Sequence, residues 1–200
     1  PVPHRKSDMP LKILGLNHNT APVEIREQVV FAGDQIPGAL QAVRDIHGVE
    51  EAVLLSTCNR TEFYVMADHD GRRRLQEWLH DAHNLDPSFA NTLFELDDDA
   101  ALRHIFRVAC GLDSMVLGEP QILGQLKDAF RDAEGAGTVG KQLSRLFQHT
   151  FSVAKKVRTD TEIGTSPVSV AYAAVTLAQQ FFSDFKKHTA LLVGAGVTIE

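Results

Sequence analysis

The sequence predicts an α/β protein built in consecutive parts. Segments of strand and helix character alternate over residues 11–95, helical periodicity dominates residues 96–160, and an apolar run followed by glycines ends the chain. A strand, helix, strand, strand, helix order is typical of a small α/β sandwich with a mixed or antiparallel sheet. We therefore expect a small N-terminal α/β sandwich, then a helical region, then the start of a further domain.

The α/β part is expected to contain short strands and amphipathic helices. Strands are predicted where apolar, β-branched and aromatic residues gather, at residues 11–17, 50–57 and 61–68. Residues 23–31 are helical or irregular, and a helix over residues 35–48 is closed by Gly48. A second helix is predicted over residues 72–85, with one apolar face formed by Leu75, Trp78, Leu79 and Ala82.

The helical part begins with acidic residues, which favour a helix N-terminus. Its first helix is predicted from residue 97 to Gly111, and the next has Pro120 near its first turn and Gly135 after its end. A helix over residues 141–159 has an apolar face formed by Leu143, Leu146, Phe147, Val153, Ala154 and Val157. Its opposite face carries Lys141, Arg145, His149, Lys155 and Lys156. Such a face is usually only solvated, and phosphate contact is the alternative.

Composition indicates an ordinary globular protein. The net charge of −6 does not favour a general polyanion binder, and no apolar stretch is long enough to span a membrane. Residues 1–10 lack the apolar segment of a signal peptide and are expected to be a flexible extension, because Met9 has the character of a natural start. Two distant cysteines do not suggest a disulfide framework, so a reducing cytoplasm is the expected location.

The end of the chain has the pattern that opens a dinucleotide-binding unit. A further helix is predicted over residues 165–182, followed by a strand at residues 190–193 and the turn GAGVTI. Strand, glycine turn and helix start are the opening of a Rossmann-like βαβ unit, although Ile199 stands where the motif has glycine or alanine. A complete Rossmann domain needs on the order of 100 further residues, so we expect this chain to be a piece of a longer protein.

Cys58 is the first candidate for chemistry. It lies in a polar insert, STCNR, between two strand-forming runs, with Arg60 two residues later. A reactive cysteine acts as its thiolate, which a nearby cation or backbone N–H groups favour. A lone cysteine is nevertheless more often a small core residue, so the residues alone leave both interpretations open. Cys110, within a helical stretch, is interpreted as core.

A polar loop and several histidines are weaker candidates. The loop GLDSMVLGEPQILGQ could present amides, hydroxyls and helix N–H groups to an anionic ligand, or could serve only capping and turns. His104 lies between Arg103 and Arg107 and could act as an acid or base, or simply pack. His80 and His83 have metal-like spacing but no third ligand, so no metal site is expected.

These stretches together resemble the glutamyl-tRNA reductase family. The resemblance covers nearly all of residues 11–200 and is carried by GLNHNTAPVEIRE, LLSTCNRTEFY, GLDSMVLGEPQILGQ, FSVAKKVRTDTEIGTSPVSVA and LLVGAG. It implies a catalytic domain over residues 11–160, with an α/β part to about 95 and a helical part after it. Residues 161–200 would be a linker helix and the first strand and turn of an incomplete NADPH-binding domain.

The family's chemistry assigns roles to the candidates. By resemblance, Cys58 attacks the glutamyl ester of charged tRNA and forms a thioester, which NADPH reduces to glutamate-1-semialdehyde, the first step of tetrapyrrole synthesis from glutamate. His104 matches a histidine important for activity. Substrate-contact positions match Thr57, Asn59, Arg60, Ser114, Glu119, Pro120, Gln121 and Gln125. Among these, Arg60 is our expected clamp for a glutamyl carboxylate, because its planar fork matches that anion.

The resemblance also implies a cofactor and partners. The NADPH turn corresponds to Gly194, Ala195, Gly196, Val197, Thr198 and Ile199, with Val197 where the family usually has Glu. As a partner the resemblance implies glutamate-1-semialdehyde aminotransferase, and as regulation it implies feedback by haem. It also implies a homodimer formed through a C-terminal domain, and it implies no association with a membrane. Since this chain stops at the turn, we expect it to be unable to complete hydride transfer. Two alternatives remain: a cysteine acyltransferase or thioesterase using Cys58 with His104, and a non-catalytic regulatory binding module.

Overall fold

A four-stranded antiparallel sheet forms the centre of the N-terminal part. The computed structural model describes residues 9–164, 170–182, 189 and 191. The sheet order is β2-β3-β1-β4, and its strands are β1 (Leu11–Asn17), β2 (Val49–Ser56), β3 (Arg60–Ala67) and β4 (Phe94–Asp97). The predicted antiparallel option is thus confirmed, as are the strands predicted at residues 11–17, 50–57 and 61–68, the last two of which begin and end one residue earlier than predicted. Strand β4 was not predicted, because four residues of alternating burial carry little strand signal.

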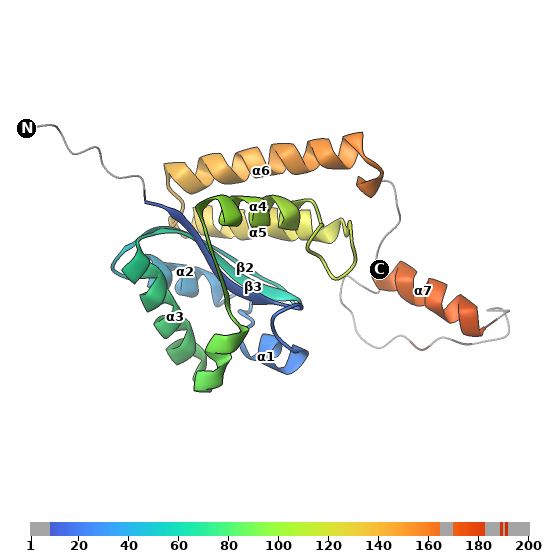
Figure 1. Cartoon of the computed structure of the whole chain (residues 1–200), viewed down its shortest axis with the longest axis horizontal. Coiled ribbons are helices and arrows are strands. Elements are labelled where there is room, and N and C mark those ends of the chain that lie inside the picture. The colour runs from blue at the N-terminus through green and yellow to red at the C-terminus, as the bar shows by residue number, and fades with distance from the viewer. Residues whose placement is uncertain (1–8, 165–169, 183–188, 190, 192–200) are drawn as a thin grey trace, which may run out of the picture.

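Helices cover both faces of this sheet (Figure 1). The helix α3 (His69–His83) packs on one face, while α4 (Asp98–Ala109), α5 (Gln121–Gly135) and α6 (Lys141–Asp160) run side by side over the other. The short α1 (Val23–Gln28) follows β1, and α2 (Ile36–Arg44) packs on β2. The predicted α/β part followed by a helical part is therefore confirmed.

The core lies between the sheet and the helices. Both faces of β1 and β3 are buried, which explains their near-continuous apolar runs. On the helical side, Tyr64 of β3 packs edge-on against Phe147 of α6, and Phe147 stacks on Phe130 of α5. The predicted apolar face of α6 is buried or half-buried and the basic face is exposed, as the periodicity indicated.

A buried carboxylate fixes the start of α6. Glu51 of β2 accepts hydrogen bonds from the backbone N–H groups of Gly140, Gln142 and Leu143 at 2.8–3.1 Å. The first N–H groups of a helix have no partner within the helix, so this carboxylate satisfies them from the sheet. The outer helix is thereby tied to the strand that leads into Cys58.

Several predicted helix ends are corrected. The helix α3 starts at His69 rather than residue 72, because Asp68 caps it by accepting from the Gly71 N–H at 2.6 Å. Pro120 occupies the N-cap position of α5, and Gly135 is its last residue rather than the residue after its end. The helix α7 (Val170–Phe181) lies within the predicted span 165–182. The predicted strand at residues 190–193 and the turn Gly194–Ile199 lie outside the described residues.

Candidate active site

Cys58 lies at the exposed tip of the β2–β3 hairpin. The strands pair up to Ser56 and Thr61, so the chain reverses through the residues between them. Cys58 is exposed, while Leu54 and Leu55 just before it are buried. The tip therefore presents a thiol to solvent at the end of a paired hairpin, and the interpretation of Cys58 as a core residue is wrong. Cys110 is buried, as predicted.

Thr57 organises this tip. Its hydroxyl oxygen accepts hydrogen bonds from the N–H groups of Asn59 and Arg60, both at 3.2 Å. Its own N–H donates to the Arg60 carbonyl at 2.8 Å. A threonine side chain that bonds nearby backbone groups stabilises a turn. Thr57 thus has a demonstrable role in shaping the turn around Cys58, and its predicted contact with substrate stays a prediction.

Arg26 of α1 also holds this tip, although no pattern in the sequence singled it out. Its Nη1 donates to the Cys58 carbonyl at 3.1 Å and to Asn59 Oδ1 at 2.8 Å. Only 8% of this arginine is exposed. The signal available in the sequence was an arginine placed among apolar residues of a helical segment, which is hard to distinguish from a surface position without the fold.

Beneath the tip lies a buried ionic network centred on Glu62. Arg60, 2% exposed, donates to Glu62 Oε1 at 2.7 Å, to Asp113 Oδ2 at 3.2 Å and to the Asp113 carbonyl at 2.6 Å. Glu62 Oε2 accepts from the Tyr64 hydroxyl at 2.5 Å and lies 3.0 Å from His104 Nε2. The network joins β3, α4 and the loop before α5, so it holds the polar loop against the hairpin.

The pKa values follow from burial and from these partners. Burial alone would raise the pKa of Glu62, but the charge of Arg60, followed by the contacts from His104 and Tyr64, lowers it to about 2. Burial, reinforced by the Glu62 charge, holds the pKa of Tyr64 well above its usual range. Glu62 is therefore an anion and Tyr64 a neutral donor at neutral pH.

The position of Arg60 bears on its predicted role as a carboxylate clamp. Its terminal nitrogens are directed at Glu62 and Asp113, so a substrate carboxylate would have to displace Asp113 to reach them. Asp113 is the more exposed of the two acids, with 17% of its side chain accessible. The clamp stays a prediction, and it now requires a specific exchange of partners.

His104 contacts the network rather than the thiol. It lies on α4 with its ring against Phe94, 5.1 Å between ring centres, and its side chain is 11% exposed. Among the described residues its hydrogen-bond partner is Glu62, and no hydrogen bond joins it to Cys58. The structure therefore does not bring the two predicted catalytic residues into direct contact.

The remaining predicted substrate positions lie in and after the loop between α4 and α5. Ser114, Glu119 and Gln121 are half-buried, and Pro120 and Gln125 are exposed. The loop is closed by a hydrogen bond from the Gly118 N–H to the Gly111 carbonyl at 2.8 Å. Burial raises the pKa of Glu119, an effect that the nearby charge of Arg60 opposes. The hydrogen bonds from Arg60 to Asp113 explain how a polar segment far along the chain is held against the strand that follows the Cys58 turn.

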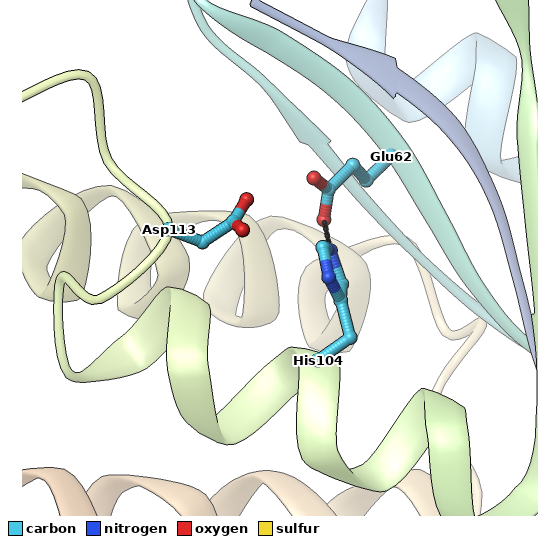
Figure 2. A group of neighbouring side chains, drawn as sticks. All are labelled: Glu62, His104 and Asp113. Atoms are coloured by element: carbon cyan, nitrogen blue, oxygen red, sulfur yellow. Dashed lines mark hydrogen bonds and ion pairs between the residues drawn. The ribbon is translucent and has the colours of Figure 1, made fainter. Parts of the chain in front are cut away.

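Glu62, His104 and Asp113 have ligand atoms within 4.8 Å of one another, a spacing that a metal ion could bridge (Figure 2). Figure 2 shows the three side chains converging from a strand, a helix and a loop. Their oxygens, however, already accept hydrogen bonds from Arg60 and Tyr64, and the guanidinium lies where a cation would be repelled. The donor set therefore fits an ion-pair network better than a metal site.

The other histidines singled out in the sequence lie on α3, and the predicted basic face lies on α6. His80 pairs with Asp81 at 3.0 Å, and His83 packs edge-on against Phe31 at 4.7 Å between ring centres. Neither belongs to a group of potential metal ligands within the part of the chain that the structure describes. The exposed cations of α6 include Arg145.

No helix in the described ranges is long and apolar enough to cross a membrane.

The fold and site define a class of protein: an α/β domain that presents one exposed cysteine on a hairpin braced by two buried arginines. Residues 14–161 match the family described as "Glutamyl-tRNAGlu reductase, N-terminal domain". The chain therefore belongs to the glutamyl-tRNA reductase family, as its motifs indicated.

Individual relatives agree with this assignment. Glutamyl-tRNA reductase of Alkalilimnicola ehrlichii is 59% identical over 193 residues, which cover 96% of this chain and 43% of that protein. That of Chromohalobacter salexigens is 54% identical over 193 residues, covering 96% and 46%. The structure of glutamyl-tRNA reductase from Methanopyrus kandleri superposes with a TM-score of 0.69 at 34% identity, covering 85% of this chain and 39% of that one. The chain thus spans less than half the length of these relatives.

Proposed function

We propose that this chain forms the acylation site of an NADPH-dependent glutamyl-tRNA reductase. The observation that carries the proposal is the exposed Cys58 thiol on a tip held by Thr57 and Arg26, in a chain of this family. A thiol needs access to its substrate and a fixed backbone to attack reproducibly, and the hairpin supplies both.

In the proposed step, the Cys58 sulfur attacks the carbonyl carbon of the glutamyl ester and the bond to the tRNA oxygen breaks. The products are a thioester on Cys58 and free tRNA, which takes up the proton lost by the thiol. A thioester is a suitable acceptor for hydride, because sulfur donates less electron density to the carbonyl than ester oxygen does.

NADPH, when bound, would supply that hydride and give glutamate-1-semialdehyde. Its predicted phosphate turn, Gly194–Ile199, lies outside the described residues, so we assign no geometry to the reduction. Residues 11–160 as a catalytic domain, and residues 161–200 as the start of an NADPH-binding domain, are part of the same proposal. A cytoplasmic location, the aminotransferase partner, haem feedback and a homodimer are proposals on the resemblance alone.

The acyltransferase or thioesterase alternative is less well supported. It needs His104 to act directly on the Cys58 thiol, whereas His104 contacts Glu62 in the described structure. It would also leave the strand and glycine turn that are predicted for residues 190–199 without a purpose.

Mass spectrometry would test the acylation step. The complete protein that carries this chain is mixed with glutamyl-tRNA, without NADPH, and the Cys58 peptide is examined for a glutamyl adduct. We expect the adduct in the wild type and in Cys110→Ser, and none in Cys58→Ser. Unmodified Cys58 in a folded protein, with the charged tRNA intact, would overturn the proposal.

A second measurement uses the 200-residue chain itself. Release of glutamate from charged tRNA without NADPH would show that this part of the protein retains acylation and hydrolyses its thioester. If the chain neither releases glutamate nor becomes acylated, the acylation site requires the remaining part of the longer protein.

A further inference from the structure

The basic face of α6 has no role in the site described above. Its basic side chains are exposed to solvent: Lys141, Arg145, His149, Lys155 and Lys156. At about 100° per residue, these positions fall within an arc of about 120° around the helix. No acidic residue occurs between Glu134 and Asp160, although the whole chain has a net charge of −6. Positive charge is therefore concentrated on these five residues of α6, which we call the basic stripe.

The cations of the basic stripe are not neutralised by neighbouring side chains. Within the described residues, no carboxylate oxygen lies within 4.0 Å of any of its lysine or arginine nitrogens. Exposed arginines on other helices, by contrast, pair with acids of their own helix: Arg73 with Glu77 on α3, and Arg131 with Asp128 on α5. The basic stripe therefore keeps its charge available for an external anion.

The first half of the basic stripe borders a groove between α6 and α4 with a volume of about 950 Å³. Lys141, Arg145 and His149 line this groove together with the side-chain amides of Gln142 and Gln148. None of the described residues that line it is acidic. Basic and amide side chains are the groups that donate to phosphate oxygens in nucleic-acid complexes. The groove thus offers donors of this kind and no negative charge.

The helix that carries the basic stripe leads from the far end of the sheet to the candidate site. Glu51, near the start of β2, holds its N-terminus, and β2 leads to Cys58 at its other end. In the last turns of α6, Arg158 donates to the Gly118 carbonyl at 3.3 Å, in the loop that Arg60 also holds. The basic stripe covers on the order of 20 Å of helix and therefore approaches this loop.

We propose that the basic stripe of α6 binds the phosphate backbone of the tRNA whose aminoacyl end is presented to Cys58. A long polyanion that reaches the thiol lies against the surface adjoining it, and α6 supplies unpaired cations on a path that ends at the candidate site. Contacts to phosphates orient the tRNA without reading its sequence. This inference rests on the proposed function, because it adds the surface that holds the substrate of the acylation step.

The test measures the dissociation constant of the complete protein for uncharged tRNA specific for glutamate, by filter binding at salt concentrations from about 50 to 200 mM. Each phosphate contact releases counterions, so the slope of log K against log salt reports the number of contacts. We expect Arg145→Gln to weaken binding about five- to tenfold and to reduce the slope by about one. Adding Lys156→Gln should reduce the slope by about one more, whereas Arg145→Lys keeps the charge and should bind as the wild type does.

Arg73→Gln is the matched control. It removes one exposed arginine from α3, on the opposite face of the sheet from α6, and changes the net charge equally (Figure 1). Its affinity and slope should stay near the wild-type values. Equal weakening in Arg73→Gln and Arg145→Gln overturns the proposal, because the effect would then come from net charge. An unchanged slope in the double variant also overturns it, and leaves the basic stripe as a solvated face or a contact for a protein.

Two further readouts separate this inference from a damaged fold and from the proposed function. Alkylation of Cys58 by iodoacetamide should be unchanged in Arg145→Gln, and slower alkylation would overturn the proposal because the hairpin tip would then be disturbed. A reduced slope in Arg145→Gln, with no glutamyl adduct on Cys58 of the wild type, would support the basic stripe and refute the acylation chemistry. A glutamyl adduct together with an unchanged slope would do the reverse.

Discussion

Two buried arginines stabilise the same hairpin tip, but they differ in the charge of their hydrogen-bond partners. Arg60 lies beneath the tip and is neutralised by Glu62 and Asp113, with Tyr64 completing the bonds to Glu62. Arg26 lies beside the tip, and within the part of the chain that the structure describes its side chain donates only to neutral oxygens. The first region is a closed ionic network and the second leaves its charge open.

Because their partners differ in charge, substitutions near the two arginines should have different consequences. A closed network of buried charges is strongly destabilised when one member is removed, because its partner is left buried and unpaired. Arg26 instead donates to two neutral oxygens of the tip, so its removal mainly releases those two groups. We therefore expect substitutions around Glu62 to alter mainly the free energy of unfolding, and those at Arg26 to alter mainly the local geometry of the hairpin tip.

Glu62→Gln should produce the largest effect. It leaves Arg60 without its closest anion and places an amide where two donors converge, so the free energy of unfolding should fall by about 3–5 kcal/mol. Urea unfolding followed by circular dichroism measures this. The matched control is Glu95→Gln, which removes the 2.8 Å ion pair of the more exposed Glu95 with Arg72. It should cost less than about 1 kcal/mol. Equal losses in the two variants would show that the network around Glu62 is not closed as described.

Acid should remove part of the same stabilisation. The folded-state pKa of Glu62 is about 2, below its ordinary value of 4.5. Its contribution is therefore fully present above about pH 4.5 and is lost as the pH falls through the folded value. The difference in free energy of unfolding between wild type and Glu62→Gln should shrink by about 3 kcal/mol between pH 5 and pH 2. Urea unfolding at several pH values checks this, and a difference that stays constant with pH would contradict the depressed pKa.

The sequence predicted the parts of the fold that periodicity specifies. Long helices such as α6 and the apolar runs of β2 and β3 were located nearly residue by residue. Strand β4 and the cap at Asp68 were missed, because a four-residue strand and a capping side chain are defined by neighbours that only the fold brings together. Local patterns thus predicted the elements, and tertiary contacts set their ends.

In the candidate site, too, local patterns revealed some residues and only the fold revealed the others. Cys58 and Arg60 could be singled out because a polar insert between strands is conspicuous in the sequence. Arg26 and Glu62 could not, since an arginine in a short helix and a glutamate within a strand look like surface residues until their burial is known. The pairing of Arg60 with Asp113 spans 53 residues of sequence, so no local pattern could reveal that Arg60 is already occupied.

His104→Ala should have a smaller effect and should act on only one region. It removes the contact with Glu62 Oε2 but leaves Arg60 and Tyr64 in place, so the free energy of unfolding should fall by about 1–2 kcal/mol. Alkylation of Cys58 should change by less than about twofold, because no hydrogen bond joins the two side chains. The two measurements are made on the same preparation. A tenfold slower alkylation would instead favour the acyltransferase interpretation, in which His104 acts directly on the thiol.

Thr57→Val should produce the smallest loss and should affect the tip alone. Valine keeps the shape of threonine but cannot accept the N–H groups of Asn59 and Arg60, so the free energy of unfolding should fall by about 1 kcal/mol. Hydrogen exchange should show faster exchange of those two amides, with Glu62 and the rest of β3 unchanged. Thr57→Ser retains the hydroxyl and should exchange as the wild type does. Faster exchange throughout β3 in the valine variant would show that the tip and the buried network are one cooperative unit, and the separation between the two arginines would then fail.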